Sequence, residues 1–210
     1  TMNTELVKRI LSSIIIIPLV FYFLISGSFF LVFFLIICFI IAFYEWINIS
    51  KKTSYKIFGF IFLSFSFFTF YDLSIELFPL IFVILISIST DVGGYIFGKI
   101  FKGPKLTRIS PNKTYAGMVG GYLLSLACLL IITNFIDYKM TPFRLFLITI
   151  LLSTISQIGD IIISYFKRKA KIKNTGNLIP GHGGLLDRID GIIFSVPALY
   201  LIDLTGFLQI

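Results

Sequence analysis

The sequence predicts an all-α, polytopic integral membrane protein with about seven transmembrane helices and a polar site that faces the cytoplasm. The first observation is composition: 57% of the residues are hydrophobic and only 13% are charged, whereas soluble domains carry about 25% charged residues. The second is a series of apolar runs close to the length of about 20 residues that spans a bilayer. The third is an uneven distribution of Lys and Arg between the loops.

The apolar runs follow one another with short connections. The seven predicted spans are Ile10–Ile25, Phe29–Ile47, Ile57–Tyr71, Leu77–Phe97, Ala116–Ile136, Phe143–Tyr165 and Ile189–Leu208. Because no connection is long enough for a soluble module, residues 1–210 are predicted to form a single membrane domain. Residues 1–76 would supply membrane-anchoring helices, and residues 77–210 would carry the polar site.

The basic residues predict the orientation. With a cytoplasmic N-terminus, all 18 Lys and Arg residues except Lys139 and Arg144 fall on the cytoplasmic side. This asymmetry follows the positive-inside rule and indicates a multi-pass protein of the cytoplasmic (inner) membrane. The net charge of +8 therefore indicates affinity for anionic membrane lipid, and no pattern typical of nucleic-acid binding accompanies it.

Asp91 and Asp160 lie inside predicted spans, where an ionised side chain costs about 2.5–3.5 kcal/mol and indicates function by default. Asp91 precedes Lys99 by eight residues, and Asp160 precedes Lys167 by seven. Both are therefore expected about 10–12 Å inside the cytoplasmic helix ends, at matching depth. The alternative is that each aspartate pairs with a nearby Lys or Tyr and serves only packing.

A basic, glycine-rich segment, Ser164–Asp190, separates the last two apolar runs. Its Pro-Gly-His-Gly-Gly run at 180–184 would let backbone amides approach an anion closely. Asp187 and Asp190 follow, and carboxylates near a bound phosphate require a cation such as Mg²⁺ between them. In the alternative interpretations, the two aspartates only cap the last helix, and His182, the only histidine, is structural.

A second basic loop runs over residues 99–114. Ser110 is expected to be the N-cap of the following helix, with Pro111 at its first position. Lys113 and Thr114 would then lie in the first helical turn, where backbone N–H groups are free to bind an anion.

Three residues and four glycines have simpler interpretations. Tyr44, Glu45 and Trp46 end the second span and are expected to anchor it at the membrane interface. Glycines four residues apart allow close helix packing, which is the role expected of Gly94, Gly98, Gly117 and Gly121.

The two polar segments resemble the phosphatidate cytidylyltransferase (CDP-diacylglycerol synthase) family. The family pattern is matched in order by Ser164, Lys167-Arg168, Lys173-Asn174, Pro180-Gly181-His182-Gly183-Gly184 and Leu186-Asp187-Arg188-Ile189-Asp190. A second matching segment joins Asp91, Gly98-Lys99 and Ser110-Pro111-Asn112-Lys113-Thr114. The resemblance covers roughly residues 91–190. Two positions depart from the family: Asn174 replaces an Asp, and Ala116 replaces a Glu.

The resemblance implies transfer of the cytidylyl group of CTP to phosphatidate, giving CDP-diacylglycerol and pyrophosphate for phospholipid biosynthesis. It implies Mg²⁺, leaves room for a monovalent cation such as K⁺, and suggests a homodimer. The catalytic residues it implies are Asp160, Asp187, Lys167 and Arg168. The implied metal ligands are Asp160, Asp187 and Asp190. The implied substrate-binding residues are Ser164, Lys173, His182, Gly183, Gly184, Arg188, Lys113 and Asp91.

Three other functions compete with this hypothesis. A CTP-dependent lipid kinase acting on polyprenols would release CDP in place of pyrophosphate. A transporter or flippase for an anionic lipid would place its acidic residues near the bilayer midplane, whereas here the charges lie toward one end of the spans. A non-catalytic membrane scaffold would leave the pattern of aspartates unexplained.

Overall fold

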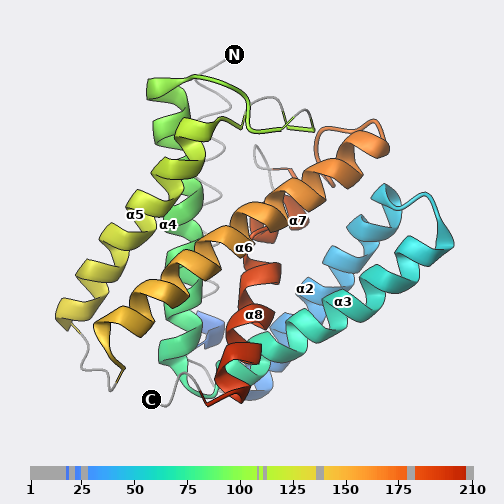
Figure 1. Ribbon diagram of the computed structural model, residues 1–210. Helices are drawn as coiled ribbons and strands as arrows, with labels where there is room; N and C mark the ends of the chain where they lie inside the picture. The colour runs from blue at the N-terminus through green and yellow to red at the C-terminus, as the bar shows by residue number, and fades with distance from the viewer. Residues whose placement is uncertain are drawn as a thin grey trace. The chain divides into compact units, whose positions relative to one another are not determined.

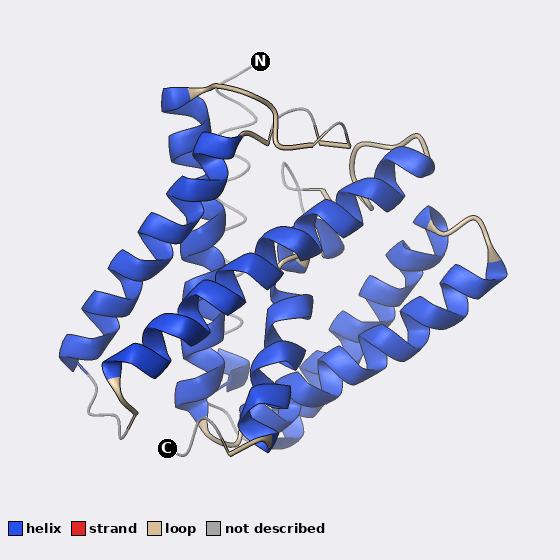
Figure 2. Cartoon of the chain, viewed as in Figure 1, coloured by secondary structure: helices blue, strands red, loops and turns tan. Residues whose placement is uncertain are grey.

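The computed structural model describes residues 18, 22–24, 28–107, 109–110, 113–135, 140–178 and 183–206. Every regular element in this part of the chain is a helix, apart from isolated bridge residues, among them the bridge between Lys105 and Thr114 (Figures 1 and 2). The helices are α2 (Ser28–Ile49), α3 (Thr53–Leu73), α4 (Leu77–Phe101), α5 (Tyr115–Phe135), α6 (Pro142–Lys169), α7 (Leu186–Ile189) and α8 (Ile192–Leu204).

Five of these helices, α2 to α6, are long and apolar enough to cross a membrane. The protein is therefore an all-helical, multi-pass membrane protein, and the second to sixth predicted spans are confirmed as helices. The longest, α6, has 28 residues, or about 42 Å at 1.5 Å per residue. It extends beyond the predicted Tyr165 to Lys169, because basic side chains in a last turn interact favourably with the helix dipole.

The first and last predicted spans have different outcomes. Ile10–Ile25 lies outside the described residues, except for residue 18 and residues 22–24. The prediction of one continuous helix over Ile189–Leu208 is wrong within its described part, because the chain breaks at Asp190 and Gly191 between α7 and α8. The 13 residues of α8 rise about 20 Å, which is less than the roughly 30 Å hydrocarbon core.

The chain forms two compact units. Unit one contains α2, α3, the end of α6 from Phe166 onward, the loop that follows it, and α7. Unit two contains α4, α5, α6 as far as Tyr165, and α8. The described residues between α6 and α7, 170–178 and 183–185, therefore belong to the same unit as the N-terminal helices α2 and α3.

An aromatic cluster ties three helix ends together in unit one. The Nε1 atom of Trp46 donates a hydrogen bond of 2.8 Å to the carbonyl of Tyr55. The ring of Phe166 lies 4.7 Å from the Trp46 ring and 5.4 Å from the Tyr55 ring, between centroids. A Cβ atom at Gly59 would overlap the indole, so glycine makes room for it. Trp46 is only 5% exposed, so its predicted role as an interface anchor is wrong.

In unit two, α4 and α5 pack backbone against backbone. A Cβ atom at Gly117 would lie 2.7 Å from the carbonyl oxygen of Gly94 and 3.4 Å from the Cα atom of Gly98, and one at Gly121 would lie 3.1 Å from the Thr90 carbonyl. The predicted close packing is confirmed at Gly117 and Gly121, whereas a Cβ atom at Gly94 would make an ordinary contact with the Gly117 carbonyl oxygen. A hydroxyl group also joins α4 to α6: Thr90 donates to Ser153 at 2.9 Å.

The loop before α5 differs from the prediction. The helix begins at Tyr115, and the Oγ1 atom of Thr114 caps it by accepting a 3.1 Å hydrogen bond from the Gly117 amide. The bridge between Lys105 and Thr114 holds the chain out of helical geometry up to that point. Ser110 is therefore not the N-cap, and Lys113 precedes the helix. Pro111 lies outside the described residues.

Candidate active site

A buried carboxylate organises the loop after α6 in unit one. Asp187 accepts three hydrogen bonds: one from the ammonium of Lys167 at 2.8 Å, one from the Thr175 amide at 2.8 Å, and one from the Gly184 amide at 3.0 Å. The side chains of Lys167 and Asp187 are 11% and 5% exposed. Charge-assisted bonds of this kind are about twice as strong as neutral ones. Asp187 therefore ties the backbone at Thr175 and Gly184 to Lys167 at the end of α6.

A second buried carboxylate, Glu45 at the end of α2, holds the same loop. Its Oε1 atom accepts from the Leu185 amide at 2.9 Å, and its Oε2 atom accepts from the Leu186 amide at 2.8 Å. The Oε2 atom also accepts from the Thr175 hydroxyl at 2.7 Å. Glu45 is 3% exposed, so its predicted role as a membrane-interface anchor is wrong. Tyr44 is 66% exposed and makes no hydrogen bond to the described residues of the loop.

The glycines of this loop are required by the two carboxylates. Gly183 has a φ of +91°, and a Cβ atom there would lie 2.7 Å from the Oδ2 atom of Asp187. A Cβ atom at Gly184 would overlap both the Thr175 hydroxyl and the Glu45 carboxylate. Gly183 and Gly184 thus let two carboxylates approach the backbone closely. The predicted contact of these glycines with a bound phosphate stays a prediction.

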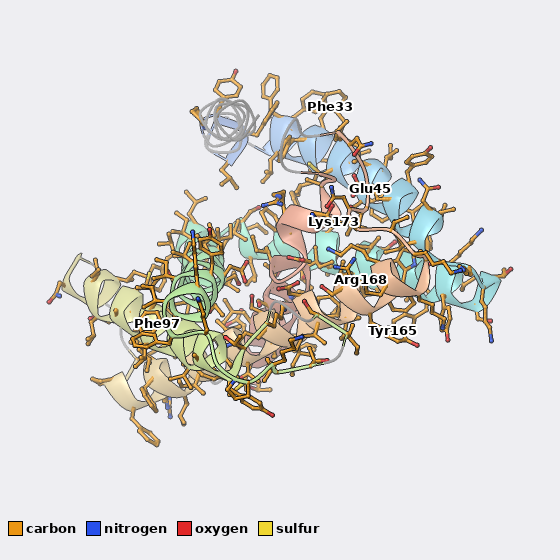
Figure 3. The ribbon with its side chains drawn as sticks, turned by 90° about the horizontal axis from the view of Figure 1, so that it is seen from above. Phe33, Glu45, Phe97, Tyr165, Arg168 and Lys173 are labelled. Carbon is orange, nitrogen blue, oxygen red and sulfur yellow. The ribbon has the colours of Figure 1, made fainter. Side chains whose placement is uncertain are left out.

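The basic side chains around the loop divide into two groups. Lys167 is buried and engaged by Asp187. Arg168, Lys173 and Arg188 are exposed, and the Arg168 guanidinium donates to the Ile172 carbonyl at 3.3 Å. Figure 3 shows Glu45 on α2, Arg168 on α6 and Lys173 on the loop. The exposed group is therefore the one that solvent reaches.

Unit two contains a second carboxylate–lysine pair. Asp160 on α6 forms an ion pair with Lys113, which lies just before α5. Ser164, one turn further along α6, donates to the Oδ1 atom of Asp160 at 3.4 Å. The two side chains are 22% exposed for Lys113 and 28% exposed for Asp160. This carboxylate therefore retains solvent access, and Lys113 and Ser164 are its partners among the residues that the structure describes.

Two further predicted residues belong to unit two. Asp91 is on an exposed face of α4, and Asp190 is buried just before α8 in the chain, where its Oδ1 atom accepts from the Gly191 amide at 3.0 Å. His182 lies outside the described residues. In the part of the chain that the structure describes, no group of three or more His, Cys, Asp or Glu side chains is placed to hold a metal ion. The metal roles of Asp160, Asp187 and Asp190 stay predictions.

The structure thus brings together Lys167, Asp187, Gly183 and Gly184 in one unit, and Asp160, Lys113 and Ser164 in the other. Glu45 is a residue of the candidate site that the sequence interpretation missed. Its partners lie 130 to 141 residues away in the chain, and two of them are backbone amides. The signal available was a Glu near the end of an apolar span, which an interface anchor explains equally well.

These features define a class: a multi-pass helical membrane protein in which a glycine-rich loop, supported by buried carboxylates and bordered by exposed basic side chains, follows a membrane-spanning helix. Comparison with known proteins narrows the class. The model of the cytidylyltransferase family matches residues 7–78 and 52–205, a range that includes both polar segments. The chain belongs to this family.

Curated relatives from three staphylococci carry the name phosphatidate cytidylyltransferase. The protein of Staphylococcus saprophyticus is 43% identical over 124 residues, which are 59% of this chain and 48% of the relative. Those of Staphylococcus epidermidis and Staphylococcus haemolyticus are 44% identical over 124 residues and 43% identical over 114 residues, covering 59% and 54% of this chain and 48% and 44% of the relatives. The chain spans about half the length of the curated relatives it matches.

Proposed function

We propose that this chain transfers the cytidylyl group of CTP to phosphatidate, giving CDP-diacylglycerol and pyrophosphate. The observation that carries the proposal is the loop held by Asp187 and Glu45, which lies within the range matched by the family model. The names of the curated relatives support phosphatidate as the acceptor. The two buried carboxylates hold the loop in place, and the exposed basic side chains beside it carry the positive charge that suits the binding of a polyanion.

The reaction joins two anions. A phosphate oxygen of phosphatidate attacks the α-phosphorus of CTP, a new P–O bond forms, the bond from the α-phosphorus to the oxygen bridging it to the β-phosphate breaks, and pyrophosphate leaves. A phosphate nucleophile near neutral pH needs no general base, so charge neutralisation and positioning supply most of the catalysis. Arg168, Lys173 and Arg188 would contact the phosphates, while Lys167 maintains the position of Asp187.

The proposed metal is Mg²⁺, and Asp160 is the described residue that fits it best. Its carboxylate is partly exposed and, among the described residues, receives only a long hydrogen bond from Ser164 besides its ion pair with Lys113. Hard oxygen donors of this type suit Mg²⁺, which would neutralise charge on the triphosphate when bound. Asp187 already accepts three hydrogen bonds, which leaves it less capacity for a metal.

The proposed location is the cytoplasmic (inner) membrane, with a cytoplasmic N-terminus and the site at the cytoplasmic surface. The distribution of Lys and Arg supports this orientation. It also suits the substrates, because CTP is water-soluble, whereas phosphatidate is held at the interface by its acyl chains.

The test is an assay of the purified full chain in detergent with phosphatidate, Mg²⁺ and CTP labelled at the α-phosphorus. The proposal predicts that the label appears in CDP-diacylglycerol with an equal amount of pyrophosphate, and that omission of phosphatidate abolishes both. Chelation of Mg²⁺ should stop turnover, and its return should restore it. Release of labelled CDP with formation of a phosphorylated lipid would contradict the proposal and indicate a CTP-dependent lipid kinase.

A further inference from the structure

We infer that Glu45 is a positioning residue for the active-site loop, so that α2 takes part in substrate binding as well as membrane anchoring. Glu45 is separated by 130 residues from its nearest loop partner in sequence, Thr175. Its carboxylate contacts no exposed basic side chain in the described hydrogen bonds. It acts on the loop through Thr175, Leu185 and Leu186.

The charge and the two-oxygen geometry of Glu45 are both used. Each carboxylate oxygen faces a backbone N–H group: Oε1 faces Leu185 and Oε2 faces Leu186. A glutamine has one acceptor oxygen and one donor nitrogen, so either orientation of its amide would place a donor against a backbone donor. A buried donor left without an acceptor destabilises the folded state. The loop therefore requires a carboxylate at this position.

Thr175 couples the two carboxylates. Its amide donates to Asp187 at 2.8 Å, and its hydroxyl donates to Glu45 at 2.7 Å. Gly184 also contacts both carboxylates. Its amide donates to Asp187, and its Cα atom packs so closely against the Glu45 carboxylate that a Cβ atom would overlap it. Loss of Glu45 would therefore release the part of the loop that leads into α7, while Asp187 keeps its own contacts.

The end of α2 is itself fixed, which makes Glu45 a firm support. The neighbouring Trp46 bonds to the Tyr55 carbonyl and packs on Phe166. Phe166 immediately precedes Lys167, the partner of Asp187. Both carboxylates thus hold the loop to the aromatic cluster of unit one, and Glu45 links the loop to α2.

The kinetic part of the test rests on the proposed function, and it compares Glu45→Gln with Glu76→Gln in the full chain. Glu76 is an exposed residue before α4 with no side-chain capping bond, so it is a matched control. Glu45→Gln should lower kcat about tenfold and raise the KM for CTP several-fold, on the scale of one or two lost buried hydrogen bonds. Glu45→Asp, which keeps the charge, should recover part of the loss.

A second pair of variants keeps the test decisive if Glu45→Gln does not fold. Thr175→Val removes the hydroxyl that Glu45 accepts from, and Thr175→Ser retains it. The Val variant should raise the KM for CTP about threefold, on the scale of a single hydrogen bond, and the Ser variant should leave it within experimental scatter. A fall in kcat with an unchanged KM for CTP in every variant would mean only a smaller folded fraction, and would overturn the positioning role.

Hydrogen–deuterium exchange separates this inference from the proposed function. In Glu45→Gln, the amides of Leu185 and Leu186 should exchange at least about tenfold faster, while the Thr175 amide, bonded to Asp187, changes less. That result in a chain without cytidylyltransferase activity would retain the positioning role and reject the proposed function. Unchanged exchange at Leu185 and Leu186 would reject the positioning role, whatever the activity.

Discussion

Two carboxylate–lysine pairs, one in each unit, differ in their exposure to solvent and in the further hydrogen bonds that the carboxylate accepts. In unit one, Asp187 and Lys167 are 5% and 11% exposed, and two backbone amides complete the coordination of the carboxylate. In unit two, Asp160 and Lys113 are 28% and 22% exposed, and within the described part of the chain only a long hydrogen bond from Ser164 supplements the pair.

The difference suggests different roles for two aspartates that look equivalent in the sequence. Removing one partner of a buried ion pair strongly destabilises the folded protein, because the other charge is left uncompensated. A partly exposed pair contributes little to stability, so its charges remain available for a ligand. We therefore expect Asp187 to hold the loop and Asp160 to act on the substrate or its metal.

The largest effect is expected for Asp187→Asn. The change leaves the buried Lys167 ammonium without a counter-charge, and we expect a loss of stability of about 3 kcal/mol. Turnover should fall at least about a hundredfold as the loop loses its geometry. Thermal unfolding in detergent and the CDP-diacylglycerol assay measure the two effects, and an unchanged unfolding midpoint would contradict the structural role.

Asp160→Asn should separate activity from stability. We expect turnover to fall about a hundredfold, with a stability change below about 1 kcal/mol because the pair is partly exposed. Asp203→Asn, at an exposed position near the end of α8, is the control and should change neither quantity. Near-normal turnover of Asp160→Asn would remove Asp160 from the reaction.

A smaller effect is expected from adding one methyl group to the loop. Gly184→Ala would force a Cβ atom against Thr175 and Glu45, and should lower kcat/KM for CTP about tenfold, the scale of a strained core contact. Gly94→Ala is the matched change in unit two, where the Cβ atom would lie at an ordinary 3.7 Å from the Gly117 carbonyl. Equal activities in the two variants would show that the loop does not need its close fit.

The smallest effect is expected for Asn174→Asp, which restores the residue usual in the family. Asn174 is exposed, so the added charge stays solvated, and kcat/KM should stay within about threefold, as for surface changes of about 0.5 kcal/mol. A large loss would mean that the loop of this chain depends on the amide. The assay at several Mg²⁺ concentrations would show whether the carboxylate changes the metal requirement.

Most of the fold followed from the sequence, because apolar length alone indicates a membrane-spanning helix. The second to sixth spans were predicted on this basis. The break at Asp190 and Gly191 was not, since hydropathy averages over two residues that interrupt a helix. The cap of α5 was placed at Ser110 because it precedes a proline, whereas the pairing of Lys105 with Thr114 sets the start of the helix.

The candidate site followed from the sequence only as a set of residues. The sequence predicts Lys167 and Asp187 as site residues, but their pairing across 20 residues depends on how the loop folds back. Glu45 was misinterpreted because its acceptor role is defined by the amides of Leu185 and Leu186, which any sequence would supply. Local spacing identifies charged motifs, whereas contacts between distant backbone groups require the structure.

The difference between the two ion pairs can be measured directly with one double-mutant cycle on each. The first combines Asp187→Asn with Lys167→Met, and the second combines Asp160→Asn with Lys113→Met, both followed by unfolding in detergent. We predict a coupling energy of about 3 kcal/mol for Asp187 with Lys167 and below about 1 kcal/mol for Asp160 with Lys113. Equal coupling energies, or a larger one for Asp160, would contradict the assignment of separate roles.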